Sequence, residues 1–300
     1  MAHDHHHHDA TTHTPKKNLI LAASLTGLFC LVEFVGGWYS NSLSLTSDAG
    51  HMLIDVGSML FILLSIFLSA KPASERNTFG YYRLEIIAAL INGALLLFVA
   101  VEIARHAIGR IETEQTIESN LMLGISSFGL LANLICAKLL HGHHHHIGTR
   151  SAYYHVMSDL ISSVGVVIAA FLIRQFHWNW IDPVISLFIA TLILWNAKKL
   201  ISSAVHVLLE SVPENTPLKS VKETLLAVEG VQGIHDLHIW TIGSGFLSAT
   251  AHLLVFPMTT LESEQIVKIA AKALKQRYGI THSTFQIESI PAPRGLTKHT

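Results

Sequence analysis

Six long apolar runs follow one another through the first two thirds of this 300-residue chain. Each run has about 20 residues or more, the length that an α-helix needs to cross a hydrocarbon core about 30 Å thick. The runs cover residues 18–39, 47–70, 84–107, 119–140, 151–173 and 183–205. This pattern predicts an α-helical membrane protein with a six-helix transmembrane bundle.

The pattern changes near Glu210, where charged residues return and Pro213 and Pro217 interrupt the chain. Beyond them it predicts a helix over 217–228, strands over 233–241 and 248–256, a helix over 261–278 and a strand over 281–289. The first strand alternates strictly, with Ile234, Asp236, His238 and Trp240 opposed to His235, Leu237 and Ile239. The α-β-β-α-β order indicates a small α+β domain, ferredoxin-like or metallochaperone-like, with its helices on one face of the sheet.

The chain therefore divides into a His-rich segment (1–17), a transmembrane domain (18–208), the α+β domain (209–290) and a tail (291–300). Composition agrees, because 50% of the residues are hydrophobic and only 14% are charged, which excludes an ordinary soluble domain. Both cysteines, Cys30 and Cys136, fall inside predicted spans. They argue against a disulfide framework and against a thiolate zinc site. We expect no nucleic-acid partner.

Lysine and arginine residues gather on alternate connections between the predicted spans. The residues that decide the orientation are Lys16, Lys17, Lys71, Arg76, Arg83, Arg150, Lys198 and Lys199. By the positive-inside rule, both termini and the α+β domain are expected in the cytoplasm. The first apolar run is too long for a cleavable signal peptide. We expect a bacterial inner membrane, although an organelle membrane fits the same physics.

One sequence motif occurs twice inside the apolar runs, as His51-x-x-x-Asp55 and as His155-x-x-x-Asp159. Residues four apart stack on one face of a helix, and ionisable groups inside a membrane usually face a partner or a transport path. Together the two pairs offer two nitrogen and two oxygen ligands, a set suited to tetrahedral Zn²⁺. The alternative is that each histidine is a satisfied core residue, but the repeat at identical spacing favours a metal site.

Histidine is concentrated as well as abundant, since 21 occur in the chain. Eleven lie in two segments expected on the cytoplasmic side, which are His3, His5, His6, His7, His8 and His13 in the head and His141, His143, His144, His145 and His146 in the fourth loop. Such tracts bind transition metals through neutral imidazole. The head has an expression tag as its alternative, whereas the internal tract cannot be a terminal tag.

At this point the residues resemble a known family. The segment from Leu43 to Asp55, Leu-Ser-Leu-Thr-Ser-Asp-Ala-Gly-His-Met-Leu-Ile-Asp, and the segment His155-Val-Met-Ser-Asp159 are similar to the second and fifth transmembrane helices of the cation diffusion facilitators. These are proton-coupled exporters of divalent metals, and the similarity extends over residues 17–290. The resemblance implies that His51, Asp55, His155 and Asp159 form the transport site, and that a set of two His and two Asp prefers zinc.

The resemblance also implies sites in the α+β domain. His235, His252 and Glu288 match positions where family members hold metal, and His238 and His282 are neighbours that would complete the set unless they are simply surface residues. In the family these sites stabilise a homodimer. Separately, Arg83 and Glu210 resemble a charge pair that joins the transmembrane and cytoplasmic parts. Some members have another metal site in the second loop, but residues 71–82 contain no Asp or His, so we expect that site to be absent.

These observations predict a secondary transporter rather than an enzyme. Zinc and protons compete for the same imidazole and carboxylate groups, so we expect zinc to leave the cytoplasm in exchange for protons, by alternating access at a site near the bilayer midplane. Zinc would be the cargo and also a structural ion of the cytoplasmic domain; the ranking of zinc against cadmium, cobalt and nickel stays open. Two alternatives are a membrane-anchored zinc sensor and an intramembrane metalloenzyme.

Overall fold

The computed structural model describes residues 16–69, 74–111, 113, 115–141, 147–243 and 245–291. Inside the helices, the side chains of residues 16–26, 55, 58–69, 136–137, 139–141, 147–156 and 158 lie outside this description. The His-rich head and the side chains of the fourth-loop tract, His141 and His143–His146, are therefore outside the described residues, as is the tail from residue 292.

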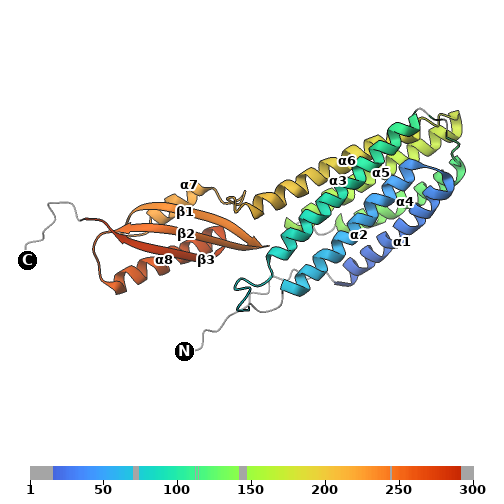
Figure 1. Cartoon of the computed structure of the whole chain (residues 1–300). Helices are drawn as coiled ribbons and strands as arrows, with labels where there is room; N and C mark the ends of the chain where they lie inside the picture. Colours follow the sequence, from blue (N-terminus) through green and yellow to red (C-terminus); the bar gives the residue numbers. More distant parts are fainter. Residues whose placement is uncertain are drawn as a thin grey trace, which may run out of the picture. The chain divides into compact units, whose positions relative to one another are not determined.

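All six apolar runs form helices (Figure 1). These are α1 (Lys16–Ser40), α2 (Leu43–Ser69), α3 (Arg83–Ile111), α4 (Ser119–His141), α5 (Ile147–Phe176) and α6 (Ile181–Leu208). Most begin or end up to four residues beyond the apolar run, because helical hydrogen bonding continues into the polar flanks. Among the described residues, three stretches are long and apolar enough to cross a membrane, Arg83–Ile111, Asp159–Phe176 and Ile181–Leu208, and Ser119–Ile135 is a shorter apolar helix.

The chain forms two compact units. One contains residues up to 60 together with 94–198, and the other contains 61–93 together with the remainder of the chain. In the first unit α4 packs along both α1 and α5. This unit buries several polar side chains and exposes many large apolar ones: buried Glu33, Asp48, His51, Ser162 and Ser163 contrast with exposed Leu31, Phe98, Phe128, Phe171 and Trp195. This distribution suits helices whose outer surface meets lipid.

The start of α2 is capped from another helix. Asp182, which is fully buried near the start of α6, accepts hydrogen bonds at Oδ1 from the hydroxyls of Ser42 and Ser44, both at 2.6 Å. The amide of Leu43 donates to Oδ2 at 2.7 Å and that of Ser44 to Oδ1 at 3.1 Å. The first amides of a helix lack intrahelical partners, and a negative charge there is favourable. Asp182 therefore fixes where α2 begins.

The second unit contains the predicted α+β domain. Its elements are α7 (Leu218–Leu226), β1 (Val231–Gly243), β2 (Phe246–Val255), α8 (Thr260–Tyr278) and β3 (Ile280–Ser289), which confirms the α-β-β-α-β order. The sheet order is β1-β2-β3; β1 and β2 are antiparallel, and β2 and β3 are parallel. The parallel pair is possible because α8 returns the chain between the two strands.

Both helices of this domain pack on the sheet around one core. Val221 and Leu225 of α7 and Leu274 of α8 are fully buried against strand residues such as Leu253 and Val255. Local signals set the bounds of α8, since Thr259 and Glu262 form a capping box and Gly279 ends the helix with φ 69°. With the helices on one face, the opposite face of the sheet is left for polar side chains.

The strict alternation predicted for β1 is wrong around Asp236. Ile234 pairs with Leu253 and Ile239 with Ala249, so β1 has one more residue than β2 between two buried pairs. The extra residue makes a β-bulge, and Asp236 has a positive φ of 52°. As a result His235 and His238 face the same side of the sheet, because their partners on β2, residues 252 and 250, are two apart.

Candidate metal sites

His51 and Asp159 meet in the first unit. The Nε2 atom of His51 lies 3.4 Å from Oδ1 of Asp159, and the His51 side chain is only 5% exposed. The two residues come from α2 and α5, and each belongs to a different copy of the His-x-x-x-Asp motif. The structure thus brings together one member of each predicted pair, two residues that lie more than 100 positions apart in the sequence.

A second contact fixes the relative direction of the two helices. Asp48, one turn before His51, contacts Ser162, one turn after Asp159, so α2 and α5 run antiparallel here. At the next turn in the other direction, the backbone positions of Asp55 and His155 then come level with each other. The side chains of Asp55 and His155 lie outside the described residues. The four-ligand set therefore stays a prediction, supported by one contact and by helix geometry.

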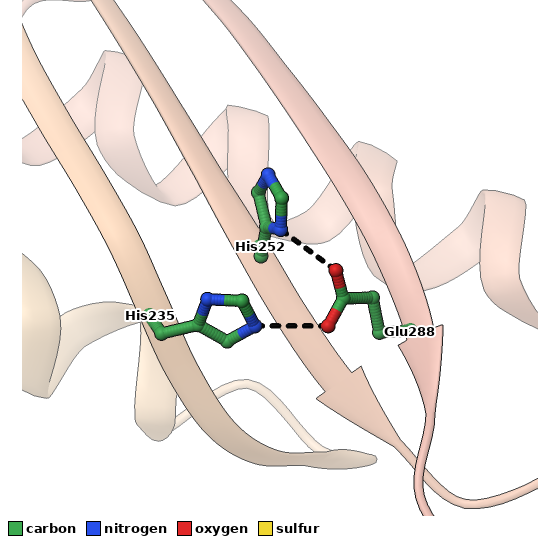
Figure 2. Close-up of side chains that lie close together, drawn as sticks. All are labelled: His235, His252 and Glu288. Atoms are coloured by element: carbon green, nitrogen blue, oxygen red, sulfur yellow. Dashed lines mark hydrogen bonds and ion pairs between the residues drawn. The ribbon is translucent and has the colours of Figure 1, made fainter.

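The polar face of the C-terminal sheet carries a second group of ligands. His235, His252 and Glu288 come from β1, β2 and β3, and Figure 2 shows their side chains gathered over the three strands with helices behind. His235 and His252 are direct partners in the antiparallel register. Glu288 Oε2 lies 2.9 Å from Nε2 of His235, and its Oε1 lies 2.7 Å from Nδ1 of His252. One ligand atom from each residue lies within 4.8 Å of the others.

The chemistry of this group fits a zinc ion. Two imidazole nitrogens and a carboxylate oxygen are common zinc ligands, and a fourth position would remain for water or another residue. The hydrogen bonds from His235 and then His252 hold the pKa of Glu288 below its usual range. This carboxylate is therefore ionised at neutral pH, in the form that binds a cation.

Asp236 joins this group although the sequence did not single it out. Its Oδ1 lies 2.9 Å from Nε2 of His238, and its Oδ2 lies 3.6 Å from Nε2 of His252. The contact with His238 is the main cause that lowers the pKa of Asp236. His238 is thus linked to the cluster through Asp236. Strict alternation assigned Asp236 to the wrong face, and only the bulge reveals its place.

His282 lies elsewhere. It is opposite Ser248 on β2, whereas His252 is opposite Gln286, four residues further along β3. Its ring makes edge contacts with Phe79, at 5.7 Å between centroids, and with Phe246, at 6.2 Å. The structure therefore places His282 among aromatic rings and away from His235.

The predicted charge pair is formed in the second unit. Nη2 of Arg83, at the start of α3, lies 2.6 Å from Oε1 of Glu210, which follows α6. Both side chains are about half exposed, at 45% and 56%. Exposed ion pairs contribute only about 0–1 kcal/mol, so the contact fixes geometry more than it adds stability.

Two family models match most of the chain. "Cation efflux transmembrane domain" matches residues 19–209, and "Cation efflux protein, cytoplasmic domain" matches residues 213–290. A relative from Bacillus subtilis (strain 168), named "Cadmium, cobalt and zinc/H(+)-K(+) antiporter", is 38% identical over 95% of this chain and 92% of its own length. The "Zinc transporter ZitB" of Escherichia coli (strain K12) is 35% identical over 97% of this chain and 94% of its own.

A solved structure is also similar over part of the chain. It is the "Metal-bound C-terminal domain of the CzcD transporter from Cuprividus metallidurans", which is 36% identical. The match covers 24% of this chain and 99% of the solved one, with a TM-score of 0.23.

Proposed function

This chain belongs to the cation diffusion facilitator family, a family of metal cation transporters, and from that premise we propose that it exports Zn²⁺ from the cytoplasm in exchange for protons. The observation that carries the proposal is the contact between His51 and Asp159, 3.4 Å apart. It joins the two helices that bear the repeated motif, at a buried point inside an apolar bundle. With Asp55 and His155 one turn away, the site offers four ligands to one ion.

The donor set supports zinc as the preferred cargo. Two nitrogens and two oxygens suit tetrahedral coordination, whereas Mg²⁺ prefers oxygen ligands and keeps its waters. Cadmium and cobalt remain possible cargo, and the relative from Bacillus subtilis is named for all three metals. Selectivity among them depends on geometry and metal supply.

Proton exchange follows from the same ligands. An imidazole binds zinc only when it is neutral, and a carboxylate only when it is ionised. A site that opens to the cytoplasm loses protons and takes up metal; when it opens to the other side, incoming protons displace the metal. This is antiport by alternating access at a site inside the bundle.

The roles that we propose for the other parts of the chain depend on zinc export by the bundle. We propose that both termini lie in the cytoplasm of a bacterial cell, with the bundle in the inner membrane. His235, His252 and Glu288 would hold a structural zinc ion in the cytoplasmic domain, aided by Asp236 and His238. Two chains would form a homodimer through this domain, as expected for the cytoplasmic-domain family that it matches. The ion pair between Arg83 and Glu210 would connect the domain to the bundle.

Zinc flux into sealed proteoliposomes with an imposed pH gradient tests the proposal. We expect uptake by the parent protein that depends on the gradient and falls at least about 100-fold in Asp55→Ala and in Asp159→Ala, because each removes an ionised ligand. His51→Ala and His155→Ala should behave alike. Thr191→Ala, an exposed position on α6, is the control and should keep parental flux.

The same assay separates the two rival classes. A membrane-anchored zinc sensor or an intramembrane metalloenzyme would bind zinc without moving it across a sealed bilayer. Zinc binding by the parent protein with no flux would therefore refute the transporter proposal. Flux that ignores the pH gradient would refute proton exchange alone.

A further inference from the structure

Asp48 is a buried carboxylate on α2 that the proposed metal site does not use. It is 1% exposed and lies one helical turn before His51. The sequence alone leaves two readings for it, solvation at the helix end or a place along the access path, and its burial excludes solvation. A carboxylate in a low-dielectric interior needs hydrogen-bond partners.

The hydrogen-bond partners of Asp48 lie on α5, and a residue of α4 extends the network. The hydroxyl of Ser162 on α5 donates to Oδ1 at 2.5 Å, and that of Ser163 donates to Oδ2 at 3.1 Å. Nδ2 of Asn133 on α4 donates in turn to Oγ of Ser163 at 2.8 Å. Each of these three partners is buried. Both carboxylate oxygens are thus held by α5, and the chain of hydrogen bonds continues to α4.

This network lies directly beside the proposed transport pair. Asp48 precedes His51 by one turn on α2, and Ser162 follows Asp159 by one turn on α5. The Asp48–Ser162 contact and the His51–Asp159 contact are therefore neighbours along the line where α2 and α5 pack antiparallel, which we call the seam. The network lies toward the end where α2 begins. Asp55 and His155 continue the seam in the opposite direction.

Ser162 has a second acceptor within reach. Its Oγ lies 2.9 Å from the carbonyl oxygen of Asp159 as well as 2.5 Å from Asp48. A hydroxyl has one hydrogen, which is donated to one acceptor at a time. A rotation of this hydroxyl would therefore satisfy Ser162 within α5 while it releases Asp48. The contact between α2 and α5 can therefore open while the Ser162 hydroxyl keeps a hydrogen-bond acceptor.

We propose that Asp48, Ser162, Ser163 and Asn133 form a hydrogen-bonded lock that holds α2 on α5 and opens when metal is released on the side where α2 begins. The proposal rests on the proposed transport function. Alternating access opens one side of the site at a time, so a closed seam on one side must part in the other arrangement. Hydrogen bonds to a buried charged group favour the closed arrangement by about 10-fold or more each. Asp48 is then a positioning residue, which acts on transport without touching the metal.

The double variant Ser162→Ala/Ser163→Ala tests the lock, because it removes both donors and leaves the metal ligands in place. Everted membrane vesicles expose the cytoplasmic face, and Zn²⁺ sealed in the lumen competes for the site when it faces outward. We expect the lumenal Zn²⁺ concentration that halves uptake to fall at least about 10-fold, because the outward-facing arrangement gains population. The Kd of Zn²⁺ for the purified full-length protein should stay within about threefold of the parent.

Two further variants make the test specific. Ser162→Thr, with Ser163 unchanged, keeps both hydroxyl donors and should keep most of the parental inhibition constant. Ser126→Ala removes another buried hydroxyl, one that donates at 3.3 Å to the carbonyl of Leu123 in its own helix, and should change nothing.

The lock is overturned by either of two results. One is an unchanged lumenal inhibition constant in the double variant; the other is loss of zinc binding together with a lower melting temperature, which marks a purely structural role. Failure of the proposed function would appear separately, as absence of zinc uptake by the parent protein in the same vesicles.

Discussion

His51 and Asp159 show what a single contact contributes to the site. Along the sequence each histidine has its own aspartate four residues later, yet the contact that the structure forms joins His51 to the aspartate of the other pair. Residues four apart on a helix share a face, so we expect each pair to present both of its members on one face. The buried contact between His51 and Asp159 supports the proposal that the two pairs form one ligand set.

In the C-terminal domain, neighbouring strands rather than neighbouring helices bring the candidate ligands together. His235 and His252 are cross-strand partners, and Glu288 reaches both from β3. Cross-strand neighbours lie close enough for both side chains to bind one ion. The bulge at Asp236 adds a second carboxylate beside His252.

Removal of one ligand from this cluster should abolish its zinc binding. We expect His252→Ala to weaken Zn²⁺ binding by the cytoplasmic domain more than about 100-fold. The change removes one proposed ligand, and it also removes the imidazole that contacts the carboxylates of both Asp236 and Glu288. The measurement is zinc titration of the full-length protein in detergent, in an Asp159→Ala background that removes the transport site.

His282→Ala is the matched control for that titration. His282 lies on the same sheet but packs against Phe79 and Phe246, so its loss should leave the stoichiometry unchanged. Equal losses in the two variants would contradict the assignment of the cluster.

At the scale of elements, α2 is the helix on which the most depends. It carries His51, Asp55 and Asp48, and its first turn is held by Asp182 from the start of α6. Four hydrogen bonds from three residues converge on that one carboxylate. Because the cap sets where α2 begins, it also sets the height of the proposed metal ligands along the bundle.

Asp182→Ala should therefore destabilise the protein. The change leaves the hydroxyls of Ser42 and Ser44 and the amides of Leu43 and Ser44 without this acceptor, and each buried unsatisfied group costs about 1–3 kcal/mol. We expect a lower melting temperature in detergent, measured by the loss of soluble protein on heating. Asp182→Asn retains one carbonyl acceptor and should lie between the parent and the alanine variant; a melting temperature equal to that of the parent in Asp182→Ala would rule out the cap.

At the scale of the whole molecule, one chain folds by two rules. Its first unit buries polar groups such as Asp48 and exposes large apolar side chains such as Phe98, whereas its C-terminal domain buries Leu253 and Leu274 and exposes His235. The first distribution is stable in lipid and the second in water. Both residues of the Arg83–Glu210 pair belong to the second unit, Arg83 at the start of α3 and Glu210 after α6.

Charge reversal at this pair tests whether it serves transport or stability. We expect Arg83→Glu to reduce zinc flux severalfold through repulsion of Glu210, and Arg83→Glu/Glu210→Arg to restore most of it. The stability of the protein should change by no more than about 1 kcal/mol, because the pair is exposed. Flux through proteoliposomes and thermal melting, both at low and high salt, measure the two effects; a double variant as inactive as the single one would contradict a direct charge contact.

Much of this architecture could be predicted from the sequence because the signals are local. Apolar length defined the six helices, and alternation with turn residues defined the order of the C-terminal elements. The repeated motif singled out His51 and Asp159, whereas His235 and His252 were implied by the resemblance to the cation diffusion facilitators. The predicted strand ends differ from the observed ones by up to two residues, because residues beside a turn carry weak signals.

The set of elements and the chemistry that they carry can be predicted from the amino-acid sequence, since both depend on residues that are close along the chain. Which groups contact one another depends on the folded arrangement. The lock at Asp48 and the cap at Asp182 join residues more than 100 positions apart, and the face of Asp236 depends on an extra residue in β1 relative to its partner strand. Such contacts arise from packing and register, which no local pattern encodes.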